Sequence, residues 1–274
     1  MNIIDAHPHI YSDDRSKYPT IDDPWNPGEP ATAEDLKSKM DDASVGRAVF
    51  IQTSTFYGHD NRYVMDSTRQ YSDWATGVVT LSPDDPQHLE VLEDAVKNYS
   101  VRGLRGTSDV QGKIDSPNVR RIWSKARDLG MVVNCMVMDD LDRVAEIEAL
   151  ASELDDLNIV IDHCLMLNTI RKTEETLVAL EKLASHPNIH AKLTSGTHGS
   201  ARVYPHEDMH GPLKRVIESF TPQRCVWGSN FPNALWSKGT SYAQNLSLFT
   251  DEIGLSQSDL EAILGGTAER LWFS

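Results

Sequence analysis

Short apolar runs that alternate with helix-forming stretches constrain the fold of this chain more than any other feature. Eight such runs occur in the sequence, and each has the length of a strand buried on both faces of a parallel sheet. They cover Ile3–Ala6, Arg47–Gln52, Gly77–Leu81, Val101–Leu104, Met131–Met138, Ile159–Ile161, Ile189–Leu193 and Arg224–Trp227.

The stretches between these runs carry helix signals. Ser82-Pro83 and Ser116-Pro117 each precede apolar residues at helical spacing, and Gly130 follows the second stretch as a stop. Eight strands alternating with helices within about 250 residues are typical of a (β/α)8 barrel. We therefore expect one α/β barrel domain over residues 1–274. A doubly wound open sheet is the main alternative, but no Gly-x-Gly-x-x-Gly follows the first run. Further helices are expected over Asp140–Leu154, Thr169–Ala184 and Met209–Phe220.

Composition narrows the classes of partner. The 274 residues carry a formal net charge of −15, which disfavours nucleic acid and anionic membranes. No apolar stretch approaches the about 20 residues of a membrane span, and the N-terminus lacks a secretory pattern. The three cysteines lie in apolar runs, which favours a reducing compartment. We expect a cytoplasmic protein with a small-molecule substrate, and self-association into a homo-oligomer stays open.

Ionisable residues gather where the apolar runs end, which is where such barrels place catalytic groups. His7-Pro8-His9 closes the first run, and residues two apart on a strand face the same side, so both imidazoles could bind one metal ion. His163 closes the sixth run. Three neutral imidazoles with an open position suit a catalytic Zn²⁺. Arg105 closes the fourth run and could bind a substrate carboxylate through both arms of its guanidinium, or form an ion pair that closes the barrel.

Several motifs, taken in order, resemble the amidohydrolase superfamily. They are Asp5-x-His7-x-His9, Asp162-His163 and Gly228-Ser229-Asn230-Phe231-Pro232. More narrowly, the chain resembles the amidohydrolase-related (family 2) branch of small lactonases, dicarboxylate-lactone hydrolases and decarboxylases. Two further runs, 101–106 and 266–271, are also similar to that branch, so the resemblance extends over nearly the whole chain.

The resemblance implies roles for the histidines. His7 and His9 match metal ligands, and His163 matches a histidine that binds metal or polarises the substrate carbonyl. The sequence offers neither the extra carboxylate nor the carbamylated lysine of a binuclear site, because Lys192 lies on the wrong strand. We therefore expect one divalent metal, Zn²⁺, or none.

Asn230 departs from the pattern, since the family usually has aspartate there. An amide can donate or accept a hydrogen bond but cannot remove a proton from water. Three explanations stay open. In the first, the subgroup natively carries Asn and uses another base such as Asp162. In the second, the chain is an engineered inactive form, and in the third, the protein no longer catalyses.

The resemblance favours a hydrolase of a small, carboxylate-bearing lactone, with His163, Asn230 and Arg105 at the reacting groups. A decarboxylase of an aromatic acid and a barrel that binds a ligand without turnover are the alternatives, whereas a nuclease-like barrel conflicts with the acidic charge. Trp25 and Tyr18 in the long first loop could form an apolar wall. Candidate substrate-binding residues, whose alternative role is to cap loops, are Gln52, Ser54, Tyr57, Thr194 and His198.

Overall fold

The computed structural model describes residues 2–237 and 239–274 and contains one eight-stranded parallel sheet. Its strands follow one another in chain order, each paired with the next. The strands are β1 Ile3–Asp5, β2 Val45–Ile51, β3 Ala75–Thr80, β4 Val101–Gly106, β5 Val132–Cys135, β6 Ile159–Ile161, β7 Ile189–Lys192 and β8 Cys225–Val226. Each of the eight predicted runs therefore overlaps a strand, although β2 and β3 begin two residues earlier than predicted and β4 ends two residues later.

Backbone hydrogen bonds close this sheet into a barrel just past the ends of β1 and β8. The Ala6 N–H donates to the Trp227 carbonyl at 3.1 Å, and the Asn230 N–H donates to the His7 carbonyl at 3.0 Å. These bonds join the first strand to the last, as the predicted (β/α)8 barrel requires.

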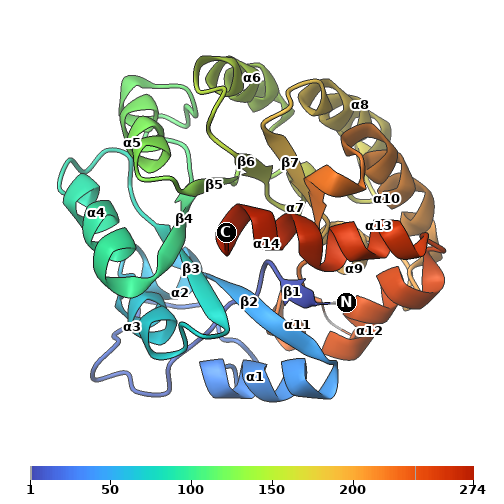
Figure 1. The fold of residues 1–274 in the computed structure, drawn as a ribbon, viewed down its shortest axis with the longest axis horizontal. Coiled ribbons are helices and arrows are strands. Elements are labelled where there is room, and N and C mark those ends of the chain that lie inside the picture. The colour runs from blue at the N-terminus through green and yellow to red at the C-terminus, as the bar shows by residue number, and fades with distance from the viewer. Residues whose placement is uncertain (1, 238) are drawn as a thin grey trace.

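Helices surround the barrel (Figure 1). The longer ones are α1 Ala33–Asp42, α3 Arg62–Gln70, α4 His88–Tyr99, α5 Pro117–Asp128, α6 Val144–Glu153, α8 Thr173–Ala184 and α10 Glu207–Phe220. The shorter α-helical segments are α2 Ser54–Tyr57, α7 His163–Met166, α9 Ser195–His198, α11 Asn233–Trp236, α12 Tyr242–Ser247, α13 Gln257–Glu261 and α14 Thr267–Trp272. Short 3₁₀ helices cover Leu141–Arg143 and Pro222–Arg224, and short π-helices cover Leu248–Glu252 and Ala262–Gly266.

Local sequence explains where these helices begin. The Ser116 side chain accepts a hydrogen bond from the Val119 N–H and Pro117 occupies the first turn of α5, as predicted. The helix expected directly after Ser82-Pro83 begins later than predicted, because α4 starts only at His88. The His88 Nδ1 atom accepts a hydrogen bond from the Ser82 N–H at 3.0 Å. The sequence analysis did not predict α1, which a capping box between Thr32 and Asp35 starts.

The barrel end that carries both chain termini is sealed by apolar side chains. Helix α14 lies across this end in Figure 1, and its Trp272, only 2% exposed, packs inside the barrel. We call this apolar cluster the floor of the barrel. Its buried members are Ile4, Ala6, Val49, Ile51, Val78, Val132, Val160, Val226, Ala268 and Trp272.

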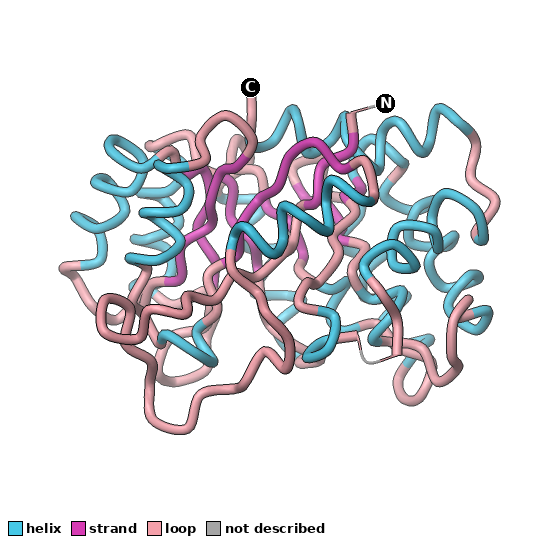
Figure 2. Tube along the Cα trace, turned by 90° about the horizontal axis from the view of Figure 1, so that it is seen from below, coloured by secondary structure: helices cyan, strands magenta, loops and turns pink. Residues whose placement is uncertain are grey.

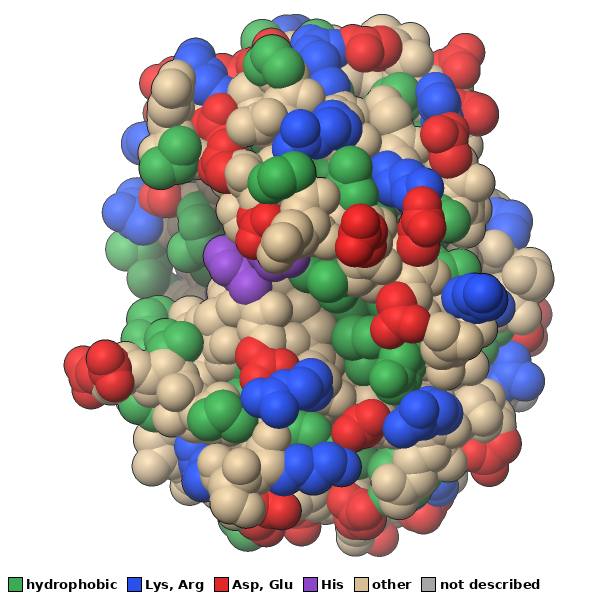
Figure 3. Space-filling model, turned by 90° about the vertical axis from the view of Figure 1, so that its left-hand side faces the viewer, with side chains coloured by type: hydrophobic (Ala, Val, Ile, Leu, Met, Phe, Trp, Pro, Cys, Tyr) green, Lys and Arg blue, Asp and Glu red, His purple; other side chains and the backbone are tan. Residues whose placement is uncertain are grey.

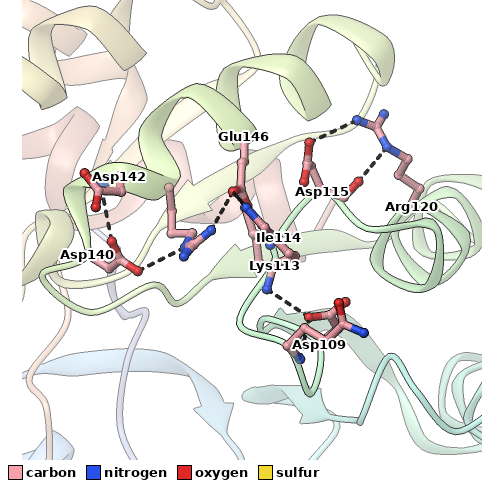
Figure 4. Close-up of polar contacts among 10 residues, drawn as sticks. Asp109, Lys113, Ile114, Asp115, Arg120, Asp140, Asp142 and Glu146 are labelled. Carbon is pink, nitrogen blue, oxygen red and sulfur yellow. Dashed lines mark hydrogen bonds and ion pairs between the residues drawn. The ribbon is translucent and has the colours of Figure 1, made fainter.

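The loops that follow the strands gather at the opposite end, which we call the mouth (Figure 2). The loop after β4 is fastened to α6 there. Glu146 of α6 accepts hydrogen bonds from the Ile114 N–H at 2.9 Å and from Lys113 Nζ at 3.1 Å (Figure 4). Asp109 accepts from the Lys113 N–H at 2.8 Å, which holds the turn before it. These bonds fix a loop that borders the mouth.

The outer surface carries mixed charge. On the side formed by the helices at the left of Figure 1, acidic and basic side chains are interleaved and form no basic stripe (Figure 3). Among the described residues, no helix combines the length and the hydropathy that crossing a bilayer would require.

Candidate active site

The end of β1 places two histidines side by side in the mouth. The strand ends at Asp5, so His7 and His9 lie just beyond it. Buried Asp5 fixes this turn, because its carboxylate accepts from the His7 N–H at 3.1 Å, the Ser229 N–H at 2.8 Å and the Tyr242 hydroxyl at 3.0 Å. The His7 and His9 ring centroids lie 5.0 Å apart.

A buried group of charges lies beneath the histidines. Lys192 Nζ is 2.9 Å from Asp162 Oδ1 and 3.1 Å from His7 Nδ1. Arg105 Nε lies 3.4 Å from Asp162 Oδ2, at ion-pair distance but without hydrogen-bond geometry. Asp162 therefore compensates two cations. Burial lowers the pKa of Lys192, and Asp162 opposes that shift.

His163 begins an unusual turn. Four consecutive residues have a positive φ, in the left-handed region that residues other than glycine rarely adopt. The values are 54° for His163, 47° for Cys164, 55° for Leu165 and 56° for Met166. The His163 Nδ1 atom lies 2.6 Å from Thr194 Oγ1, and the Cys164 thiol donates to the Lys192 carbonyl at 3.2 Å. These bonds hold the His163 ring with its centroid 4.5 Å from that of His7. Strained backbone of this kind is often found at functional sites.

Asn230 lies in the mouth between β8 and the histidines. Its φ of 54° is left-handed, a conformation that Asn tolerates better than most residues, and its N–H bonds to the His7 carbonyl. The side chain is 3% exposed, and its Oδ1 has no hydrogen-bond partner among the described residues. The amide is therefore free to contact a bound molecule.

The mouth encloses a cavity of about 500 Å³ that brings many of these groups together. Arg105, His163, His9 and Asn230 line it, whereas His7 lies just beneath. The other lining residues are Trp25, Thr53, Ser54, Thr55, Thr107, Met136, Met138, Met166, His198, Leu235 and Trp236. The volume is that of an ordinary small-molecule site.

Burial keeps the imidazoles of this site neutral. It lowers the pKa of His9 to about 3 and that of His198 to about 4. The pKa of His163 is also well below its usual value because of burial, with further lowering by His198 and Arg105. Burial, and then the nearby Lys192, also lower the pKa of His7. At neutral pH the rings can therefore donate one N–H and accept at the other nitrogen.

The structure separates the predicted substrate-binding residues into two groups. Ser54 and His198 line the cavity, whereas Gln52, Tyr57 and Thr194 do not. Gln52 Nε2 donates to the carbonyls of Gly58 and Asp60 at 2.9 and 3.1 Å, the Tyr57 hydroxyl accepts from the Ser12 N–H at 2.7 Å, and Thr194 contacts His163. These hydrogen bonds hold the three side chains against loops and the His163 ring, although Gln52 Oε1 has no partner among the described residues, and their role in substrate binding stays a prediction. In the first loop, Trp25 lines the cavity, but Tyr18 bonds to Asp66 at 2.8 Å instead.

Several lining residues were not predicted from the sequence. Thr107 and Met136 are two of them, although they directly follow β4 and β5. Their position just past a strand end is the signal that could have identified them. Leu235 and Trp236 arrive on α11, and no sequence pattern places that segment over the cavity.

The imidazoles have the donor atoms that a zinc ion needs. His9 Nδ1 donates to the Ile51 carbonyl at 2.8 Å and His163 Nδ1 lies beside Thr194 Oγ1, so the second nitrogen of these two rings is available to a metal. His7 Nδ1 accepts from Lys192, so His7 Nε2 carries the proton of the neutral ring and would bind a metal only after a change of tautomer. His7 Nε2 is buried and has no hydrogen-bond partner among the described residues. Neutral imidazoles are good Zn²⁺ ligands, so the residue set fits one ion. In the part of the chain that the structure describes, however, no three His, Cys, Asp or Glu side chains already form a metal-binding group. Binding would therefore require the rings to shift.

Comparison with known proteins decides the family. The profile of the amidohydrolase family matches residues 4–273. This chain belongs to the amidohydrolase family. The sequence resemblance is thereby confirmed, and the chain is a hydrolase of this family.

Relatives of this amidohydrolase include lactonases. An L-fucono-1,5-lactonase of Burkholderia ambifaria is 30% identical over 243 residues, which cover 84% of this chain and 80% of the relative. A 4-sulfomuconolactone hydrolase of Rhizobium radiobacter is 24% identical over 84% of this chain and 75% of its own.

Solved structures show the same barrel. A probable 2-pyrone-4,6-dicarboxylic acid hydrolase of Acinetobacter baumannii, with citric acid bound, superposes with a TM-score of 0.81 over the full length of both chains at 17% identity. An amidohydrolase of Burkholderia multivorans with bound zinc gives the same TM-score at 21% identity, over 100% of this chain and 99% of that one. At these identities the likeness establishes the fold alone.

Proposed function

We propose that this amidohydrolase opens a small lactone that carries a carboxylate. The observation that carries the proposal is that one cation, Arg105, and a cluster of neutral imidazoles line the same cavity. Arg105 Nε faces Asp162, and among the described residues neither terminal nitrogen of Arg105 donates a hydrogen bond. Those nitrogens match the two oxygens of a carboxylate. The lactonase relatives support the same chemistry.

Hydrolysis requires a water oxygen to bond to the lactone carbonyl carbon while the ring C–O bond breaks. The water proton must move to a base, and the ring oxygen that leaves must gain a proton. A neutral imidazole can accept the first proton at one nitrogen and donate an N–H to the carbonyl oxygen from another ring. We assign these tasks to His163 and His9, which line the cavity, and the ring that has taken the water proton returns it to the ring oxygen that leaves.

Asn230 contributes a hydrogen bond rather than proton transfer in this proposal. Its amide can donate to the carbonyl oxygen or orient the water, but it has no acid–base function. Asp162 is engaged with Lys192 and Arg105, and its Oδ2 lies buried at the Arg105 side. Proton removal therefore falls to the histidines.

A zinc ion, when bound, would polarise the carbonyl and lower the pKa of a water molecule. His7, His9 and His163 are the residues that would hold it, and His9 and His163 would then bind the ion through the nitrogens that otherwise transfer protons. Arg105 and Asn230 would keep the same positioning tasks with or without the ion.

The proposal is tested by following hydroxy-acid release from a panel of lactones, with and without added Zn²⁺. A parallel assay for CO₂ release from aromatic acids addresses the decarboxylase alternative. Hydrolysis that is faster for carboxylate-bearing lactones than for neutral ones supports the proposal. Decarboxylation without any lactone hydrolysis would overturn it.

Asn230→Asp then separates the three explanations of this residue. If Asn replaced a working base, restoring the acid should raise turnover by about 10²–10⁴-fold, the usual worth of a general base. If the subgroup natively uses Asn, the change should leave turnover unchanged or reduce it, because a new anion would lie beside Arg105. Asn26→Asp is the matched control, because Asn26 is exposed, lies outside the cavity lining and uses its side-chain oxygen only to accept from the Gly28 N–H.

A further inference from the structure

The cavity has two chemically different sides. Its hydroxyl groups and its cation come from the loop after β2 and from the end of β4, whereas its large apolar side chains come from the other loops, beside His9, His163, His198 and Asn230. The polar side consists of Thr53, Ser54, Thr55, Arg105 and Thr107. The apolar side comes from the loops after β1, β5, β6 and β8 and consists of Trp25, Met136, Met138, Met166, Leu235 and Trp236. A bound molecule must therefore present two faces as well.

Only one charge faces the ligand in the described part of the cavity. Arg105 is the one side chain among the lining residues that comes from a lysine, arginine, aspartate or glutamate. One carboxylate can bind to Arg105. A second carboxylate would face mainly thioether and indole groups, where no cation compensates its charge. The several hydroxyl groups of a sugar lactone would find few hydrogen-bond partners on the same apolar surface.

The apolar side forms a wall of aromatic rings that reaches solvent. The rings of Trp25 and Trp236 lie 5.4 Å apart at 39°, and Trp236 in turn lies 5.6 Å from the His9 ring. Trp25 is 53% exposed and Met138 is 50% exposed, which is unusual for large apolar side chains. A ligand in the cavity would cover this surface, and the flexible methionines can adapt to its shape.

We propose that the substrate is a lactone with a single carboxylate on one side and a ring-sized apolar group, aryl or alkyl, on the other. Arg105 binds the carboxylate, and the wall of Trp25, Trp236 and Met138 packs against the apolar group. This inference rests on the proposed lactone hydrolysis, which it deepens by excluding sugar lactones and lactone dicarboxylates as preferred substrates.

Binding can be measured without turnover by calorimetric titration with three carboxylates. 3-Phenylpropanoate has one carboxylate and a ring, glutarate has two carboxylates, and gluconate has one carboxylate and several hydroxyls. We expect 3-phenylpropanoate to bind at least about tenfold more tightly than the other two, the usual gain from burying a ring. Equal or tighter binding of glutarate or gluconate would overturn the inference.

Variants locate the effect on the apolar wall. Trp25→Ala should weaken 3-phenylpropanoate binding about fivefold, Trp25→Phe should restore most of it, and gluconate binding should be unchanged. Met138→Ser should act in the same direction. Val110→Ser is the matched control, because Val110 is 85% exposed on the β4 loop but does not line the cavity. Equal weakening of all three ligands in the wall variants would contradict the assignment.

Turnover separates this inference from the proposed function. A phenyl-substituted γ-lactone carboxylate should have a higher kcat/KM than 2-pyrone-4,6-dicarboxylate or L-fucono-1,5-lactone. Preferred hydrolysis of the dicarboxylate or the sugar lactone would refute the inference and leave lactone hydrolysis standing. Selective binding of 3-phenylpropanoate with no hydrolysis of any lactone would refute the proposed function and support the ligand class.

Discussion

The two ends of the barrel interior differ in chemistry although the same strands build both. The floor is an apolar cluster sealed by Trp272, with the buried ring of His190 near it, whereas the mouth contains Arg105, Asp162 and Lys192 with the other histidines. Lys192 joins the two ends, because its Nζ lies 5.6 Å from the centre of the Trp272 ring while it bonds to Asp162 and His7.

The comparison indicates that the residues that mainly stabilise the fold lie at the floor of this barrel, whereas the residues available for chemistry lie at the mouth. Apolar burial at the floor stabilises the fold by removing surface from water, and it tolerates no unpaired charge. The mouth holds groups that are costly to bury, and each of them needs a partner. Substitutions at the floor should therefore act on stability alone, whereas substitutions at the mouth should act on stability, activity or both.

The largest effect is expected for Asp162→Asn at the mouth. The change leaves Lys192 and Arg105 buried without their carboxylate, and breaking such a pair typically costs about 3–5 kcal/mol of unfolding free energy. Urea denaturation measures the loss, with exposed Asp13→Asn as the control. A loss below about 1 kcal/mol, the typical value of a surface pair, would mean that the charges are solvated and that the two ends differ less than the structure indicates.

A somewhat smaller effect is expected for Trp272→Ala at the floor. Removing a buried tryptophan leaves a cavity, and about 3 kcal/mol should be lost because α14 can partly collapse into it. The KM for lactones should stay the same, since Trp272 does not reach the cavity in the mouth. A changed KM at full folding would show that Lys192 transmits the floor's packing to the site.

Acid should destabilise the fold through buried neutral histidines near both ends. Burial lowers the pKa of His190 on β7 to about 3, so the unfolded chain binds a proton more readily than the folded one. The contribution of His190 to the free energy of unfolding is complete above about pH 6.5 and is lost as the pH falls towards 3. The loss between pH 7 and pH 5 is about 2 kcal/mol.

His190→Gln should remove that part of the pH dependence, and His198→Gln at the mouth should remove less, because His198 is only partly buried. The measurement is the free energy of unfolding in urea at several pH values. If both variants keep the wild-type slope, these rings do not account for the acid sensitivity.

The smallest effect is expected for Arg105→Lys. The charge remains, but a single ammonium replaces the planar fork, so the KM for a carboxylate-bearing lactone should rise about tenfold. Neutral lactones should be unaffected. Arg102→Lys on the outer face of the same strand is the control, and equal KM values in all three proteins would favour a purely structural role for Arg105.

Much of the fold could be predicted because the patterns that specify its strands and most of its helices lie within short stretches of the sequence. The apolar runs from Val101 to Leu104 and from Ile159 to Ile161 mark strands buried on both faces, and such strands need no alternation. Helix α1 escaped prediction because Leu36 and Met40 are its main buried apolar side chains among many polar ones. The start of α4 was misplaced because Pro83 and Pro86 build a turn before the helix.

The site could be predicted less completely. Arg105, His163 and Asn230 follow strand ends and carry residue types that stand out there. Gln52 and Tyr57 carry similar types but satisfy loop backbone groups, which only the folded loop reveals. Met166 and Trp236 resemble ordinary core residues in the sequence, and only tertiary structure turns them towards the cavity.

The position of the chain ends has a practical consequence. Both ends of the described chain lie at the end of the barrel that α14 crosses, opposite the loops of the mouth (Figures 1 and 2). A surface, a fluorophore or a fused protein attached through either terminus would therefore stand behind the catalytic face. Immobilised in this way, the enzyme would present its open mouth to the solution, and diffusion of substrate would not pass the attachment point.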